Sequence, residues 1–191
     1  MYYFAYGANL NKRGMKMRCP QATAVGVAVL HGYKLCFKRW ADIIPAKDAC
    51  VHGVLWAVTP ACLRALDAYE GDDYGQVKVT VEHNGETVEA IAYAIKTHLP
   101  FAPPDMDYHR EIAIGYREWG LDEALLRRAR YDTLNVGPGN VGPGAAPAPP
   151  PAPHQPEATV LPPRRRALWD PATQGKGSMD DVLRVKPKPR S

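Results

Sequence analysis

Glu70 is the residue of this 191-residue chain whose position most favours acid–base chemistry. It ends a predicted helix over residues 60–70 and is followed by Gly71, a natural residue just past a helix C-terminus. The helix dipole disfavours an ionised carboxylate there, which suits a group that must both take and return a proton. A Glu before a helix-ending glycine is more commonly a solvated residue, so position alone leaves both roles open.

A predicted β-hairpin places two tyrosines close together. The turn is Asn84-Gly85, and the alternating valines at 77, 79 and 81 predict the first strand. A two-residue loop sets Tyr74 opposite Ile95 and residue 76 opposite Tyr93. The two tyrosines are then diagonal neighbours on one face, within reach of a shared ligand. Ordinary cross-strand packing is the alternative.

Several kinds of catalysis are excluded or weakly supported. Residues 1–134 contain no serine, which excludes a Ser-His-Asp hydrolase from this part of the chain. No histidine pair stands at i, i+4, and the cysteines show neither C-x-x-C spacing nor zinc-type pairing with histidine, so we expect no metal and no cofactor. We expect all four cysteines to be small buried residues of a reduced, cytoplasmic protein. They are Cys19, Cys36, Cys50 and Cys62.

The elements that must hold these residues are a mixture of strands and helices. Thr59 is a predicted N-cap, with Pro60 at the first helical position. Aromatic and apolar residues recur at helical spacing from Tyr108 to Trp119. Strands are predicted at residues 2–6, 25–29, 33–37, 51–58, 77–81 and 87–96, and helices at 60–70, 108–119 and 122–134.

The composition divides the chain at residue 134. Residues 135–191 hold 13 of the 19 prolines and no tyrosine, so we expect a Pro/Gly/Ala-rich, basic and disordered tail. Residues 1–134 carry 16 Lys and Arg against 16 Asp and Glu, so the net charge of +4 belongs to the tail. This balance gives no sign of nucleic-acid binding. No apolar run approaches the length of about 20 residues that a membrane helix needs, and no signal peptide is evident.

One glycine motif in the tail resembles a dinucleotide-binding fingerprint but lacks its structural context. Residues 137–142 spell G-x-G-x-x-G, but a helix precedes them and a proline follows. The dinucleotide-binding fingerprint requires a strand before it and a helix after it. We therefore do not expect nucleotide binding here.

Two motifs resemble those of the γ-glutamylcyclotransferases. Residues 4–10, Phe-Ala-Tyr-Gly-Ala-Asn-Leu, resemble the Y-G-S-N-L signature of that family, and residues 66–71 resemble its L-D-x-x-E-G motif. Their order and separation match as well, as do Arg18-Cys19-Pro20 and the segment 51–56. The resemblance covers about residues 2–134.

The resemblance implies an α+β fold, a small mixed β-barrel with flanking helices. It makes Glu70 the catalytic acid–base. The implied substrate-binding residues are the turn Tyr6, Gly7, Ala8 and Asn9, together with the pocket tyrosines Tyr74, Tyr93 and Tyr108. Ala8 departs from the family pattern, which usually has serine there. The departure removes a hydroxyl and bears on affinity and substrate choice more than on reaction type.

The implied reaction is cyclisation of a γ-glutamyl amide to 5-oxoproline with release of an amine. The nucleophile is the α-amine of the substrate, so the enzyme needs no serine, cysteine, metal or cofactor. Two alternatives stay open: a related enzyme acting on γ-glutamyl-amines or another γ-glutamyl metabolite, and a non-catalytic binding module. In the second, the P-x-x-P motifs at 147–150 and 150–153 recruit partners. The sequence leaves open a homodimer and does not specify the partners of the tail.

Overall fold

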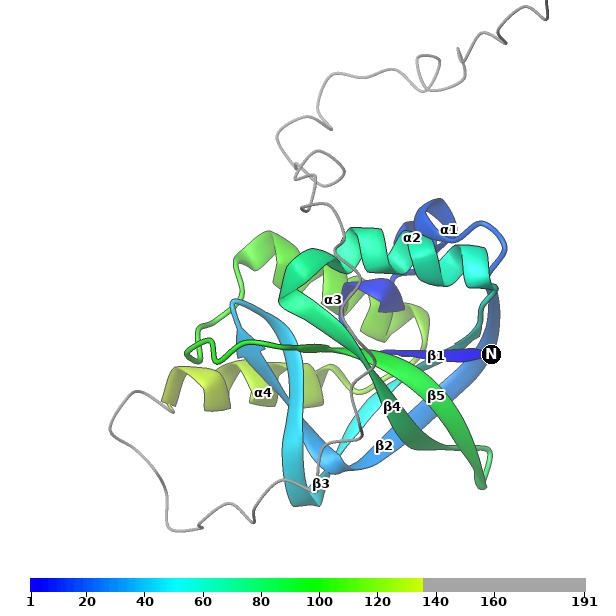
Figure 1. Ribbon diagram of the computed structural model, residues 1–191. Coiled ribbons are helices and arrows are strands. Elements are labelled where there is room, and N and C mark those ends of the chain that lie inside the picture. The colour runs from blue at the N-terminus through cyan, green and yellow to red at the C-terminus, as the bar shows by residue number, and fades with distance from the viewer. Residues whose placement is uncertain (136–191) are drawn as a thin grey trace, which may run out of the picture.

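The computed structural model describes residues 1–135, and five strands close into a barrel in the order β1-β3-β2-β4-β5 (Figure 1). Only the contact of β1 with β5 is parallel among the named strand pairs. The predicted mixed barrel with flanking helices is therefore confirmed. The strands are β1 (Tyr2–Ala5), β2 (Thr23–Lys38), β3 (Trp40–Ala57), β4 (Tyr74–His83) and β5 (Glu86–Ile95).

Four α-helices and two short 3₁₀ turns complete this part of the chain. Helices α1, α2 and α3 gather at one end of the barrel, and α4 lies along its side (Figure 1). Thr133 of α4 accepts a hydrogen bond from the backbone of Phe37 in β2 at 3.2 Å. The helices are α1 (Lys12–Arg18), α2 (Pro60–Glu70), α3 (Met106–Glu118) and α4 (Glu123–Asn135), and the turns are η1 (Ala8–Leu10) and η2 (Gly71–Asp73).

The β4–β5 hairpin has the predicted register without a bulge. Tyr74 pairs with Ile95, and Gln76 pairs with Tyr93. Asn84 and Gly85 have φ values of 53° and 81°, as a type I′ turn requires. Tyr74 and Tyr93 are therefore diagonal neighbours on one face.

The strands β2 and β3 are longer than predicted. The separate strands expected at 25–29 and 33–37 are parts of one strand, with register shifts near Gly26 and Gly32. β3 begins at Trp40 rather than Val51, and Arg39 turns the chain between the two strands with a φ of 71°. The first half of β3 contains proline and charged residues, so only its pairing with β2 reveals it.

Helix α2 has the predicted ends. The hydroxyl of Thr59 accepts a hydrogen bond from Cys62 N at 3.2 Å, and Pro60 occupies the first turn. Gly71 ends the helix with a positive φ of 63°. The turn η2 then leads directly into β4, so α2 carries Glu70 to the end of the barrel where Tyr74 begins its strand.

The core fills the barrel and the contacts of the helices with it. Fully buried side chains include Phe4, Leu30, Phe37, Val54, Leu66, Ile112 and Tyr116. A side chain at Gly115 of α3 would collide with Leu10, which explains how closely α3 covers η1. Three cysteines are buried as expected, but the expectation was wrong for Cys50, which is exposed on β3.

Within the described part of the chain, none of the helices has the length and apolar character to span a membrane. The predicted tail, its P-x-x-P motifs and the glycine motif at 137–142 lie outside the described residues.

Candidate functional site

The Glu70 carboxylate contacts the turn that carries the other predicted site residues. Asn9 Nδ2 donates to Glu70 Oε1 at 3.0 Å and to the hydroxyl of Tyr3 at 2.9 Å. Asn9 is 3% exposed, and Glu70 is partly buried. The fold thus joins η1 to the C-terminus of α2 through a side chain of the turn.

Arg18 fixes the orientation of the Asn9 amide. Its Nη1 donates to Asn9 Oδ1 at 2.9 Å, and its Nη2 donates to the hydroxyl of Tyr69 at 3.0 Å. The guanidinium also stacks 3.9 Å from the centre of the Tyr69 ring. Because arginine can only donate, it holds the amide oxygen of Asn9 and leaves the NH₂ group to face Glu70.

Four buried tyrosines surround Glu70 with neutral hydroxyls. Burial is the largest cause that raises the pKa of each of them, and the negative charge of Glu70 raises each further. For Tyr93, the hydrogen bond to Asp67 is the second cause. Since they remain protonated, these tyrosines place no charge against the carboxylate. They are Tyr3, Tyr6, Tyr74 and Tyr93.

Tyr74 and Tyr108 are anchored to the same residue of β3, beside Gly7. The Tyr74 hydroxyl donates to the carbonyl oxygen of Ala41 at 2.6 Å. The backbone N–H of Ala41 donates to the Tyr108 hydroxyl at 3.3 Å. A Cβ atom on Gly7 would lie 3.4 Å from that hydroxyl and 3.3 Å from Ala41 Cβ. The absence of a side chain at Gly7 therefore permits this close approach.

Tyr6 and Tyr93 connect the turn to α2 through β5. The Tyr6 hydroxyl donates to the carbonyl oxygen of Tyr93. The Tyr93 hydroxyl donates to Asp67 Oδ1 at 2.7 Å, and Gln76 Nε2 donates to the same oxygen at 2.7 Å. Although Tyr74 and Tyr93 share a face, their hydroxyls bond to different elements, β3 and α2.

The turn from Gly7 to Asn9 presents backbone N–H groups. Its first internal hydrogen bond runs from Leu10 N to the carbonyl oxygen of Gly7 at 3.0 Å. The N–H groups of Ala8 and Asn9 precede that bond and have no partner within the turn. Ala8 is 7% exposed, so its methyl group is buried.

The structure thus brings all eight predicted site residues to one end of the barrel and adds contacts that sequence reasoning did not assign. Asp67 had a signal, because it precedes Glu70 by three residues on the same helix. Arg18 and Tyr69 lie in the matched segments 18–20 and 66–71, but neither match assigned them a role, and Tyr3 had no signal because its role depends on packing between distant segments. Among residues 1–135, no group of three or more His, Cys, Asp and Glu side chains is placed to hold a metal ion.

Comparisons with known proteins identify a family and several relatives of this chain. The family model "Gamma-glutamyl cyclotransferase, AIG2-like" matches residues 3–120. Mouse γ-glutamylcyclotransferase is 31% identical over 145 residues, which span 67% of this chain and 76% of the mouse protein. The human γ-glutamylcyclotransferase is 32% identical over 136 residues, or 62% and 71% of the two chains.

Solved structures show the same fold. A γ-glutamyl cyclotransferase superposes with a TM-score of 0.60 at 27% identity, covering 77% of this chain and 93% of that one. A human protein described as uncharacterised superposes with a TM-score of 0.58 at 26% identity and the same coverage. The two motifs meet at the hydrogen bond between Asn9 and Glu70, and the family model, the relatives and the barrel fold all match. The chain therefore belongs to the γ-glutamyl cyclotransferase, AIG2-like family.

Proposed function

We propose that this protein is a γ-glutamylcyclotransferase. It converts a γ-glutamyl amide into 5-oxoproline and releases an amine or amino acid. The substrate supplies the nucleophile, because its free α-amine attacks its own γ-carbonyl carbon and closes a five-membered ring. The C–N bond to the leaving group then breaks.

The observation that carries this proposal is the hydrogen bond of 3.0 Å between Asn9 and Glu70. It joins the turn that would hold the γ-glutamyl group to the carboxylate of Glu70, the last residue of α2. A proton acceptor must lie within hydrogen-bond reach of the amine that it deprotonates. A γ-glutamyl group held by the turn would place its α-amine beside Glu70.

Glu70 would act first as a base and then as an acid. The substrate α-amine has a pKa of about 8 and is largely protonated at neutral pH, so a base must remove a proton before attack. The same carboxyl group can return that proton to the leaving nitrogen. General acid–base catalysis of this kind contributes about 10²–10⁴-fold to the rate.

The turn would hold the substrate and the oxygen on which negative charge develops. The N–H groups of Ala8 and Asn9 precede the first hydrogen bond of the turn and would serve as its donors to the substrate. Gly7 lets Ala41 and the Tyr108 hydroxyl pack close to the backbone of the turn. Folding the substrate so that amine meets carbonyl lowers the barrier further, since a well-oriented intramolecular reaction has an effective molarity of up to about 10⁵–10⁸ M.

The tyrosines would form the walls of this site. The hydroxyls of Tyr74 and Tyr108 both bond to the backbone of Ala41, which lies beside Gly7. Tyr93 of β5 bonds to Asp67 of α2. Their apolar rings would exclude water from the reacting groups, which strengthens electrostatic interactions inside the site. Tyr6 would fix the turn itself, through its bond to the backbone of β5.

Ala8 favours a second candidate, an enzyme of the same reaction type with a different leaving group. Its buried methyl group stands where the family usually has a serine hydroxyl. Substrates that depend on that hydroxyl would bind less well here, whereas the backbone donors would remain. A γ-glutamyl-amine or another γ-glutamyl metabolite would then be the preferred substrate. The presence of Glu70 argues against a non-catalytic binding module.

The test is mass-spectrometric detection of 5-oxoproline from a panel of γ-glutamyl dipeptides, γ-glutamyl-lysine and glutathione. We expect at least one of them to yield 5-oxoproline and the matching amine in equal amounts. The Ala8→Ser variant should change KM among the substrates more than kcat. If no member of the panel yields 5-oxoproline while the folded protein still binds γ-glutamyl compounds, the binding-module alternative is favoured.

A further inference from the structure

Cys19 and Cys62 form a pair of thiols outside the proposed catalytic site. Cys19 caps the C-terminus of α1, and Cys62 lies in the first turn of α2. Cys19 Sγ donates to the carbonyl oxygen of Cys62 at 3.5 Å, and the two thiols are close enough for each to shift the pKa of the other. Cys36 is buried beside a backbone carbonyl instead, and Cys50 is exposed beside His52.

The surroundings of the two thiols shift their pKa values in opposite directions. Burial opposes ionisation of Cys62, but hydrogen bonds from Thr59, Cys19 and the backbone of Gln21 outweigh it and lower the pKa of the thiol below its usual 9.0. Thr59 Oγ1 lies 3.3 Å from the Cys62 sulfur. Burial, followed by the neighbouring Cys62, raises the pKa of Cys19 to about 12. Cys62 is thus the better thiolate, and Cys19 is the protonated thiol beside it.

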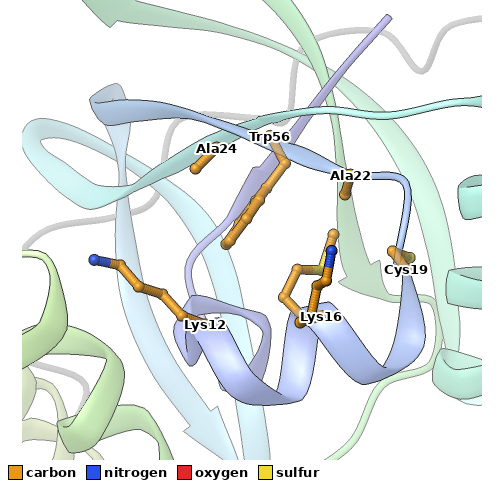
Figure 2. A pocket seen from close by; sticks show the side chains of 7 residues that line it. Lys12, Lys16, Cys19, Ala22, Ala24 and Trp56 are labelled. Atoms are coloured by element: carbon orange, nitrogen blue, oxygen red, sulfur yellow. The ribbon is translucent and has the colours of Figure 1, made fainter.

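A surface cavity gives a small oxidant access to the Cys19 side of this pair. Cys19 forms part of the wall of a cavity of about 280 Å³, and Figure 2 shows it beside Ala22 at the end of α1. Lys12 and Lys16 also line the cavity, and because both are exposed they place it at the protein surface. The residues that line it are Lys12, Met15, Lys16, Cys19, Ala22, Ala24 and Trp56.

We infer that Cys19 and Cys62 are a redox modification site, which a hydroperoxide converts into an intramolecular disulfide. The Cys62 thiolate attacks one peroxide oxygen, the O–O bond breaks, and a sulfenic acid forms on Cys62. The departing oxygen takes up a proton as water or alcohol. Cys19 then loses its proton and attacks the sulfenic sulfur, which forms the S–S bond and releases hydroxide that becomes water. In total, two thiols and one hydroperoxide give one disulfide, one water and one further water or alcohol.

The disulfide would tie α1 to α2 covalently. Closing it brings the two sulfur atoms to about 2.05 Å from each other. Cys19 directly follows Arg18, and Cys62 lies in the first turn of the helix that ends at Glu70. The modification therefore joins the two helices whose residues meet at the Asn9 amide.

The test uses the full-length reduced protein. It is treated with hydrogen peroxide under native conditions, alkylated to block the remaining thiols, digested and mapped by mass spectrometry. We expect a cross-linked peptide containing Cys19 and Cys62, two hydrogen atoms lighter than the sum of its parts and absent after reduction with dithiothreitol. The Cys36→Ala and Cys50→Ala variants should form the same cross-link.

A second measurement separates the roles of the two sulfur atoms. In the Cys19→Ala variant, Cys62 should stop at the sulfenic acid and react with dimedone. The inference is overturned if Cys19 and Cys62 stay reduced in the wild-type protein while Cys50 is oxidised, or if their disulfide forms only in denaturant. Because no readout depends on turnover, this result is independent of the proposed catalytic function.

Discussion

Asn9 Nδ2 lies 3.0 Å from Glu70 Oε1, although the two residues are 61 positions apart in the sequence. The contact gives the turn a second role besides its backbone donors, because a side chain of the turn holds one oxygen of the carboxylate. Arg18 sets the direction of the Asn9 amide from the other side. Acid–base chemistry and substrate binding would therefore depend on one connected set of hydrogen bonds.

The variant Glu70→Gln is expected to lower kcat at least about 10²-fold, because it keeps the shape of the side chain and removes the proton acceptor. Asn9 can still donate to the amide oxygen, so the melting temperature should change little. Glu89→Gln, at an exposed position on β5, is the matched control and should retain full activity. Near-normal turnover of Glu70→Gln would remove Glu70 from the mechanism.

The variant Arg18→Met is expected to weaken catalysis through Asn9. Without the guanidinium, the Asn9 amide is free to turn its oxygen toward Glu70, which favours the protonated carboxyl group. We expect kcat to fall by up to about 10²-fold and the acid limb of the kcat–pH profile to move to higher pH. Arg18→Lys should recover part of the activity.

Arg13→Met is the control for Arg18→Met, since Arg13 is exposed on the same helix. An unchanged pH profile of Arg18→Met, combined with a lower melting temperature, would mean that Arg18 only stabilises the fold.

Local signals predicted the elements that are specified by their own residues. Thr59, Pro60 and Gly71 set the ends of α2, and Asn84-Gly85 set the register of the hairpin. The first half of β3 lacked such signals, because its strand conformation depends on pairing with β2. This segment is a strand because it pairs with β2, although its own residues have little preference for strand conformation.

The candidate site was predictable to the same extent. The eight residues assigned from the motifs lie together, but their individual roles remain predictions. Arg18 and Tyr69 lie in matched segments, but their contacts and that of Tyr3 arise because α1, β1 and α2 converge, which spacing along the chain does not show. Cys50 was mispredicted because residue type favours burial, whereas its position on β3 places it at the surface.

The free energy of unfolding is expected to fall steeply in alkali. The five tyrosines with raised pKa values hold their protons in the folded protein, whereas in the unfolded chain they ionise near 10.0. Above that pH the folded state binds more protons, so stability is lost as pH rises, by about 1.4 kcal/mol per pH unit for each such tyrosine. The five are Tyr3, Tyr6, Tyr74, Tyr93 and Tyr116.

Urea unfolding at about pH 8 and about pH 11 measures this loss. The variant Tyr116→Phe should make the loss smaller, because it removes one of the titrating groups. Tyr2→Phe is the control, since Tyr2 is 41% exposed, and it should leave the loss unchanged. Equal stability of the wild-type protein at both pH values would contradict the expectation.

Removal of residues 136–191 is expected to leave folding and turnover unchanged. The barrel and helices α1–α4 lie within residues 1–135, and the family match ends at residue 120. The deleted segment has no tyrosine and only one aromatic residue, Trp169, so it has little apolar surface to add to a core. Melting temperature and kcat/KM of the truncated and full chains provide the comparison. A large loss of activity would show that the tail contributes to the site or to an interface.

The free α-amine of the substrate is the most direct point at which to test the proposed reaction. An ordinary amidase attacks with water or with its own side chain, and so tolerates a blocked amine if space allows. A cyclotransferase cannot, because the blocked nitrogen is its nucleophile. A γ-glutamyl dipeptide that gives turnover should therefore be compared with its N-α-acetyl and N-α-methyl forms. Methylation keeps a basic nitrogen, so slow cyclisation should survive it.

The deciding measurement is the identity of the first product, followed by mass spectrometry from the earliest time points. The account predicts 5-oxoproline without glutamate from the free-amine substrate, and no reaction with the acetylated form. It also predicts that Glu70→Gln yields neither product. Free glutamate as the primary product, or cleavage of the acetylated substrate at a comparable rate, would contradict the proposed cyclisation.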